Sequence, residues 1–374
     1  MELELTDDQE LLRDTTVRFL GSDAPITRVR NLIDDPTGFD PAWVREGADL
    51  GWFAMLVPEE LGGGSVSDRP LVDASIVAEE LGRSVQPGPF LPMNVVACAL
   101  ANYGNDEQRA EVLPVIVAGE KIATWAMADA GGSWDGTGVA ATRTNGGFTL
   151  SGTKSFVQDA ASADWFLVTA SVGSEPAQFL VPRDAAGLDV SPLVCFDLAR
   201  RLGTVSFDGV VVAASALVGE PGHATARNIG HQLDVALALQ CAETVGVLDA
   251  MFEMTLQYSK DRIAFGRPIG SFQSLKHILA DLALYVETCK AGAAAAVRSV
   301  DRSADDASEV ASMAKAYIGD VAIDVAQESL QIHGGIGYTW EHDLHLFMRR
   351  ASVNSVLYGS PAWHRERVCA VHGL

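Results

Sequence analysis

The spacing of hydrophobic residues changes twice along the 374-residue chain. Up to about residue 120 the apolar residues recur at helical intervals, and from Ile122 to about Val218 they form short runs typical of β-strands. From about Ala224 the helical interval returns and holds to the end. This order predicts an α+β protein with an N-terminal α-helical domain (1–120), a middle β domain (121–220) and a C-terminal helical bundle (221–374).

Capping residues and turn residues indicate where the helices and strands of each part begin and end. A capping box at Thr6-Asp7-Asp8-Gln9 starts the first helix. The other helices are expected at 41–50, 69–83, 92–102, 106–118, 225–263, 272–302, 306–332, 342–357 and from about Pro361. The strand-like runs are 148–150, 165–169, 178–181, 205–207 and 210–212, with Trp125 and Phe156 also on strands. Turn residues at Asn145-Gly146-Gly147, Gly187 and Asp208-Gly209 predict hairpins, and thus a small barrel or sandwich.

Composition narrows the class of function. The chain is 48% hydrophobic and 20% charged, as in soluble globular proteins, and its net charge of −22 argues against a nucleic-acid partner. The acidic N-terminus has no apolar signal core, and no segment is expected to reach transmembrane length. The five cysteines are widely spaced without a Cys-x-x-Cys pair, which favours structural thiols in a reducing compartment. We therefore expect a cytoplasmic protein with no membrane partner.

One stretch between two of the long helices combines groups that could bind a ligand. It contains Arg262, Phe265, Gly266 and Gln273. A permanently charged planar donor suits a phosphate, an aromatic ring can cover another ring, and glycine lets the backbone approach closely. An ordinary corner between two helices is the alternative interpretation.

The other motifs in the sequence give weaker evidence of a functional site. Gly136-Thr-Gly138 lacks the setting of a dinucleotide-binding loop, and neither a Walker loop nor a G-x-S-x-G elbow occurs. Glu341, His342 and His345 have the spacing of a metal site on a helix, but a solvated or interface face is favoured. The segment Gln331–Tyr338 is either a glycine-rich helix cap or backbone placed close to a phosphate.

Six motifs in this order resemble the acyl-CoA dehydrogenase family over nearly the whole chain. They are Pro58-Glu-Glu-Leu-Gly-Gly-Gly, Ala78-Glu-Glu-Leu-Gly82, Leu113-Pro114 with Ala118-Gly-Glu120, Leu150-Ser-Gly-Thr-Lys154, Arg262-x-x-Phe-Gly with Phe272-Gln273, and Gln331-Ile-x-Gly-Gly-x-Gly-Tyr338. The α–β–α order agrees with the fold of that family.

The resemblance implies an FAD bound between subunits. In the family, the Arg, Phe and Gln of the Arg-x-x-Phe-Gly segment reach the pyrophosphate and adenine of the flavin in the neighbouring subunit, and the Gln-Ile-x-Gly-Gly turn assists them. The matching cofactor-binding residues are all present in this chain: Arg262, Phe265, Gln273, Gln331, Gly334 and Gly335.

The catalytic base that the resemblance implies is missing. The family uses a Glu at one of two positions, and here these hold Tyr358 and Ala236, so no catalytic residue is assigned. Alanine cannot accept a proton, and tyrosine with a pKa of about 10 is protonated at neutral pH. Asp234 lies two residues before Ala236, a step that rotates a side chain by roughly 200° around a helix, so it is a poor substitute.

Other family positions on the same side are also altered. Leu237 replaces the Arg of Asp-x-x-Arg, Ala128–Trp134 is a shortened flavin-lining strand, Phe156-Val157-Gln158 replaces Trp-Ile-Thr/Ser, and Ala362 replaces a Gln. Residues for the subunit's own site are changed, whereas those for a neighbour's flavin are kept. This pattern predicts the partner subunit of an α2β2 acyl-CoA dehydrogenase that completes the FAD site of a Glu-bearing chain.

By resemblance, such assemblies act on bulky acyl-CoA substrates such as steroid side chains, with an electron-transfer flavoprotein as acceptor. Two alternatives stay open. One is a self-sufficient homotetrameric flavoenzyme with an unusual base such as Tyr358 or Asp234. The other is a flavin-free acyl-CoA binding or scaffold protein.

Overall fold

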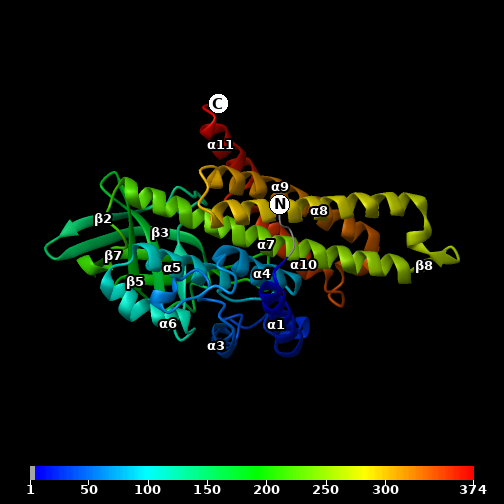
Figure 1. Cartoon of the computed structure of the whole chain (residues 1–374), viewed down its shortest axis with the longest axis horizontal. Coiled ribbons are helices and arrows are strands. Elements are labelled where there is room, and N and C mark those ends of the chain that lie inside the picture. Colours follow the sequence, from blue (N-terminus) through cyan, green and yellow to red (C-terminus); the bar gives the residue numbers. More distant parts are fainter. Residues whose placement is uncertain (1–4) are drawn as a thin grey trace.

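The computed structural model describes residues 5–374. The N-terminal helices, the sheet and the C-terminal helices occupy different parts of an elongated molecule (Figure 1). The sheet lies at one end of the long axis, the first helices lie beneath, and long C-terminal helices run along the length. The turn that carries β8 lies at the end opposite the sheet.

The first part of the described chain is helical. Its first helix begins with the predicted capping box, because the Thr6 hydroxyl accepts from the Gln9 backbone and the Gln9 side chain accepts from the Thr6 backbone. The helices are α1 (Asp7–Asp23), α2 (Ile26–Asn31), α3 (Pro41–Asp49), η1 (Glu59–Leu61), α4 (Pro70–Arg83), α5 (Phe90–Tyr103), the π-turn η2 (Gln108–Val112) and α6 (Leu113–Val117).

The middle part forms one seven-stranded sheet. Its strands are β1 (Ala123–Ala126), β2 (Val139–Thr144), β3 (Gly147–Gln158), β4 (Trp165–Val172), β5 (Glu175–Pro182), β6 (Leu188–Leu193) and β7 (Leu202–Ala213). The order is β1-β4-β2-β3-β7-β6, with β5 paired to β4. Trp125 and Phe156 fall on β1 and β3 as predicted.

Two of the three predicted hairpins are wrong. Gly187 lies between β5 and β6, which do not pair with each other, because β5 pairs with β4 and β6 pairs with β7. Asn145-Gly146 does join β2 to β3, but Asp208-Gly209 lies inside β7, which continues from Leu202 to Ala213. Gly209 has a φ of +66°, and the pairing of β3 with β7 shifts register between Leu150 and Gly152. The pair therefore makes a bulge within a strand, a role that glycine fills as readily as a turn.

The last part contains the long helices. After η3 (Ala214–Ala216) come α7 (His223–Asp261), β8 (Ile263–Ala264), β9 (Arg267–Pro268), η4 (Ile269–Ser271), α8 (Gln273–Asp301), α9 (Ala307–His333), η5 (Gly334–Tyr338), α10 (Leu344–Val356) and α11 (Pro361–Val371). These bounds agree closely with the predicted helices. The division into domains at residues 120 and 220 stays a prediction.

Helix α7 is the central element of the core. By length and hydropathy it is apolar enough to cross a membrane, which corrects the expectation that no segment reaches that length. However, 89% of its most apolar window is buried inside the molecule, so its hydrophobicity serves internal packing.

Two glycines let α4 and α7 approach closely. A Cβ at Gly82 would lie 2.0 Å from the Glu243 carbonyl oxygen, and one at Gly246 would lie 1.9 Å from that of Glu79. Each helix therefore presents a residue without a side chain to the backbone of the other, which places Glu243 deep between the two helices.

Candidate functional site

The predicted flavin-clamp residues of the first segment lie on an exposed turn at the tip of the molecule. Arg262 caps the C-terminus of α7, and Gln273 is the first residue of α8; both are exposed. Phe265 has a φ of +53° and is 96% exposed. A positive φ strains the backbone of a non-glycine residue, and exposing an aromatic ring to solvent is unfavourable. Both features together indicate a binding role for Phe265.

The structure brings the second predicted segment to the same end. Gln331 lies in the last turn of α9, and Gly334 and Gly335 begin η5, with Gly334 at a φ of +62°. The helix ends are joined by the rings of Tyr258 and His333, which stack with centroids 4.5 Å apart. Residues about 70 positions apart in sequence thus form one surface, which we call the clamp.

The clamp lies far from Ala236, one of the two positions expected for a base. Ala236 lies within α7, and Arg262 directly follows the last residue of that helix, 26 positions later. At 1.5 Å per residue this is about 39 Å. The clamp therefore cannot act on a reacting centre beside Ala236 of the same chain, and Figure 1 shows β8 at the end of the molecule opposite the sheet.

Tyr358 is unsuited to proton transfer. Its side chain is buried, and its ring stacks on Trp125 at 6.1 Å and contacts Trp134 at 5.3 Å between centroids. Burial raises the pKa of its hydroxyl further above the ordinary value, with nearby Arg200 opposing only in part. Tyr358 therefore acts as part of an aromatic cluster with Trp125 and Trp134.

Asp234 is engaged elsewhere. Its carboxylate accepts from Arg367 Nη2 at 3.2 Å and from the Ser308 hydroxyl, which ties α7 to α11 and α9. Ala236 is fully buried and offers only a methyl group. Neither of the expected base positions, nor Asp234, therefore presents a free carboxylate.

A buried lysine fixes the shortened loop that replaces the family's flavin-lining strand. Lys154 Nζ donates to Asp129 Oδ1 at 2.5 Å, to the Met127 carbonyl at 2.9 Å and to the Gly136 carbonyl at 3.0 Å. These bonds hold the loop that carries Trp134, whose indole thereby reaches Tyr358.

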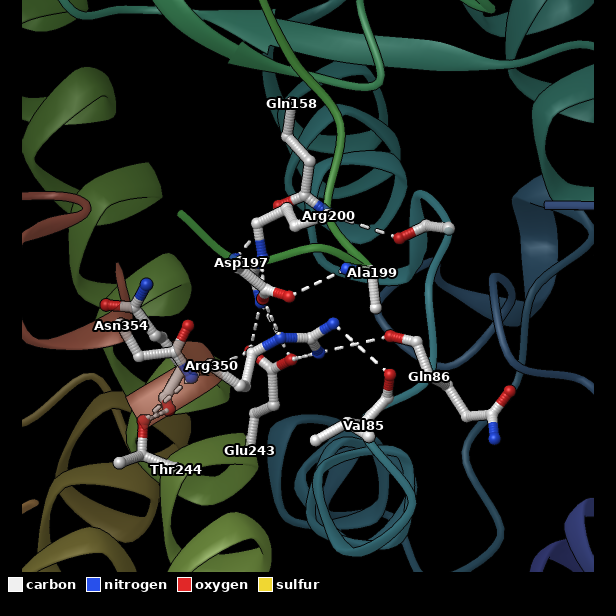
Figure 2. A network of polar contacts seen from close by, with 12 residues as sticks. Val85, Gln86, Gln158, Asp197, Ala199, Arg200, Glu243, Thr244, Arg350 and Asn354 are labelled. Carbon is white, nitrogen blue, oxygen red and sulfur yellow. Dashed lines mark hydrogen bonds and ion pairs between the residues drawn. The ribbon is translucent and has the colours of Figure 1, made fainter. Parts of the chain in front are cut away.

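Four charged side chains form a buried network between the sheet and the helices (Figure 2). Arg200 Nη2 donates to both oxygens of Glu243 at 2.8 and 2.9 Å, and Arg350 Nη1 donates to Glu243 Oε1 at 2.6 Å. Arg350 Nε also pairs with Asp197. Each of the four is at most 9% exposed.

Neutral groups complete this network. Arg350 donates to the Gln86 carbonyl at 3.1 Å and to the Val85 carbonyl at 3.3 Å, and Asn354 Nδ2 donates to Glu243 Oε2 at 3.3 Å.

Burial alone would raise the pKa of Glu243, but the guanidinium groups of Arg200 and Arg350 outweigh it and hold that pKa below its usual value. Glu243 is therefore an ionised ion-pair partner, unavailable as a proton acceptor.

These four residues were not predicted from the sequence. The available clue was Glu243, the single charge within the apolar run from Val235 to Leu248. A charge in such a run requires a buried partner. Its partners, however, come from the loop before β7 and from α10, which no local pattern could assign to it.

Two spaces near the base positions differ in size and lining. The space lined by Gln158, Arg200, Leu239, Glu243 and Arg350 has a volume of only about 20 Å³. An apolar hollow of about 400 Å³ opens beside Trp134, Phe156, Phe196, Val356 and Trp363, and no charged side chain lines it.

The remaining candidates do not form a metal site in the structure. Within residues 5–374 no three His, Cys, Asp or Glu side chains come together in a group that could hold a metal ion. The His342 ring accepts from the Leu344 backbone N–H at 3.1 Å, whereas the His345 ring stacks on Trp340. The five cysteines are free thiols.

Comparisons with known proteins agree with this arrangement. Residues 6–120 match the N-terminal domain of acyl-CoA dehydrogenases, and residues 226–371 match the C-terminal domain. The chain is 32% identical to acyl-CoA dehydrogenase IpdE2 of Mycolicibacterium smegmatis, over 97% of this chain and 98% of that one.

Solved structures of two-component assemblies are also similar. A chain of the ChsE4-ChsE5 complex from Mycobacterium tuberculosis has a TM-score of 0.90 and 26% identity, with 100% of this chain and 99% of that one covered. A chain of the Tcur3481-Tcur3483 steroid ACAD, solved as a variant, has a TM-score of 0.88 and 28% identity, with 98% of each covered. The chain therefore belongs to the acyl-CoA dehydrogenase family, whose members are oxidoreductases acting on CH–CH bonds.

Proposed function

We propose that this chain is the non-catalytic subunit of a hetero-oligomeric acyl-CoA dehydrogenase. It would complete the FAD site of a homologous partner subunit that carries the catalytic Glu, in an α2β2 assembly. The observation that carries the proposal is the separation of two surfaces in one chain. The clamp is complete and exposed at one end of α7, while both base positions lack a carboxylate.

FAD is the cofactor that the family implies, and the clamp residues fit it. Arg262 supplies a planar cation for the pyrophosphate, Phe265 an exposed ring to cover the adenine, and the Gly334–Gly335 turn a backbone open to close approach. When bound, the flavin supplies the electron acceptor for α,β-desaturation of an acyl-CoA thioester. This chain's own contribution is to bind and orient it.

A bulky acyl-CoA, such as a steroid side-chain thioester, is the proposed substrate of the assembly. Support comes from one similar structure, which is described as a steroid ACAD formed by two proteins. An electron-transfer flavoprotein remains the proposed physiological acceptor.

The self-sufficient enzyme is disfavoured by the surroundings of its two suggested bases. Tyr358 lies in an aromatic cluster with a pKa raised by burial, and Asp234 is bonded to Arg367 and Ser308. Neither carries a proton-accepting group free to meet a substrate.

The clamp is tested by Arg262→Ala in the reconstituted complex. We expect FAD affinity to fall about 10- to 100-fold, because a hydrogen bond to a charged group is worth roughly 1.5–3 kcal/mol. Dehydrogenation of acyl-CoA should fall with flavin content and recover in part at high FAD concentration. Flavin absorbance after gel filtration measures the loss.

Lys260→Ala is the matched control, since Lys260 is an exposed cation in the last turn of the same helix. It should leave FAD content unchanged. Unchanged FAD content in the Arg262→Ala complex, with the clamp otherwise folded, would refute the proposal.

A further inference from the structure

The buried network lies beside residues that take the place of the family's base and of its flavin-facing segment. Glu243 follows Ala236 by seven residues on α7, which places both on nearly the same helix face about 10 Å apart. Arg200 Nη1 donates at 3.3 Å to Gln158, which stands in the flavin-facing segment of β3. Arg350 lies on α10, just before Tyr358.

The network is electrically complete by itself. Two guanidinium cations face two carboxylates, and backbone carbonyls of the loop after α4 accept further bonds from Arg350. An alternative is that Arg200 and Arg350 form an anion site for a ligand phosphate. Most of their donors, however, are already bonded: Arg200 Nη2 and Arg350 Nη1 to Glu243, Arg350 Nε to Asp197, and Arg200 Nη1 to Gln158. Arg200 Nε has no hydrogen-bond partner, but the two carboxylates offset both positive charges, so no net positive charge remains to attract an anion.

The space that remains is too small for a substrate. A volume of about 20 Å³ admits about one water molecule, whereas small-molecule sites occupy roughly 300–1,000 Å³. The nearby apolar hollow is large enough for a ring, but no charged side chain lines it to meet the phosphates of coenzyme A.

From this geometry we propose that Asp197, Arg200, Glu243 and Arg350 form a built-in plug that closes this chain's own catalytic cleft to an acyl thioester. The inference rests on the proposed function and extends it. The cleft that has lost its base is also filled, and the plug joins the β7 side of the sheet to α7, α10 and the loop after α4. Each heterodimer therefore holds one acyl-CoA site, in the partner.

The plug is tested by measuring thioester binding to the full chain. Octanoyl-CoA and the steroid-acid thioester cholanoyl-CoA are titrated calorimetrically into the chain alone and into the complex. We expect no binding to the wild-type chain and one thioester per heterodimer in the complex. One thioester bound per wild-type chain, in the absence of the partner, would overturn the proposal.

A charge-neutral double variant, Arg200→Ser with Glu243→Ala, opens the plug and leaves the Asp197–Arg350 pair in place. We expect it to admit a thioester and to raise the stoichiometry in the complex from one to two per heterodimer. A folded variant that still binds only one would contradict the plug. Arg83→Ser with Asp249→Ala is the matched control, because it removes an ion pair between α4 and α7 outside the cleft.

A second variant covers the case in which the opened chain does not fold. Arg200→Met with Glu243→Leu replaces the pair by apolar side chains that keep the cleft filled, a change that buried ion pairs often tolerate. It should fold and bind no thioester, and binding by this filled variant would overturn the proposal. Failure of the plug would appear in thioester stoichiometry alone, whereas failure of the proposed function appears in FAD content of the Arg262→Ala complex.

Discussion

Tyr358 occupies one of the two positions at which the family carries its base, and its surroundings favour packing over proton transfer. Its backbone has a φ of +62°, and its carbonyl oxygen lies 3.0 Å from His364 Nε2. The ring is turned into the Trp125–Trp134 cluster. A backbone hydrogen bond and ring packing account for these contacts, and none of them involves proton transfer by the hydroxyl.

Tyr358→Phe should therefore leave activity of the complex intact. The substitution keeps the ring and removes only a hydroxyl whose pKa is raised. We expect kcat and kcat/KM to change by less than about twofold, because loss of a general base would lower them about 10²- to 10⁴-fold. Steady-state kinetics with an artificial electron acceptor measure this, and a hundredfold loss would instead identify Tyr358 as the base.

Asp159 gives the chain a pH-dependent stability. Burial raises its pKa to about 7, with the Gln158 hydrogen bond and the Arg200 cation opposing the shift. The folded state thus keeps a proton that the unfolded chain, with its usual value of 3.8, has lost. Stability therefore falls as the pH rises from about 4 to about 7.

Asp159→Asn should remove this cost. We expect little change in the free energy of unfolding at pH 4 and a gain of up to about 4 kcal/mol at pH 8, since each pKa unit corresponds to 1.36 kcal/mol. Urea unfolding at the two pH values measures the difference. Asp184→Asn, at an exposed carboxylate, is the control, and an equal effect of both variants at pH 8 would contradict this account.

At the scale of elements, α7 and α4 depend on close backbone contact. The two glycines Gly82 and Gly246 permit this contact, and it positions Glu243 for the network. The bounds of α7 and the other long helices were predictable, because periodicity and caps are local. The bulge at Asp208-Gly209 was not, because glycine chemistry is the same in a bulge and in a hairpin turn.

Gly246→Ala should destabilise the protein by about 2 kcal/mol or more, because its Cβ would overlap the Glu79 carbonyl oxygen and overpacking costs roughly 1–3 kcal/mol. Gly230→Ala is the matched control within α7. Its Cβ meets nothing within 4 Å, so alanine should stabilise the helix by about 0.5–1 kcal/mol. Thermal unfolding distinguishes the two, and equal midpoints would refute the close-contact interpretation.

At the scale of the whole molecule, the length of α7 separates the clamp from the buried network. The clamp lies at one end of α7 and the network lies toward the sheet, which is the separation expected if one chain completes a neighbour's flavin site and not its own. The residues of the clamp could be predicted from sequence, since each of its two segments is a short contiguous motif. The plug could not, because its four charges come from three separate segments and meet only in the fold.

We propose that this chain supplies half of a flavin site and no catalysis of its own. The most direct test is to purify the full chain alone and together with its Glu-bearing partner, and to measure bound flavin and acyl-CoA oxidation in each. We expect a colourless, inactive chain and a yellow, active complex with one FAD per heterodimer. A chain that by itself retains stoichiometric FAD and oxidises acyl-CoA would contradict the account.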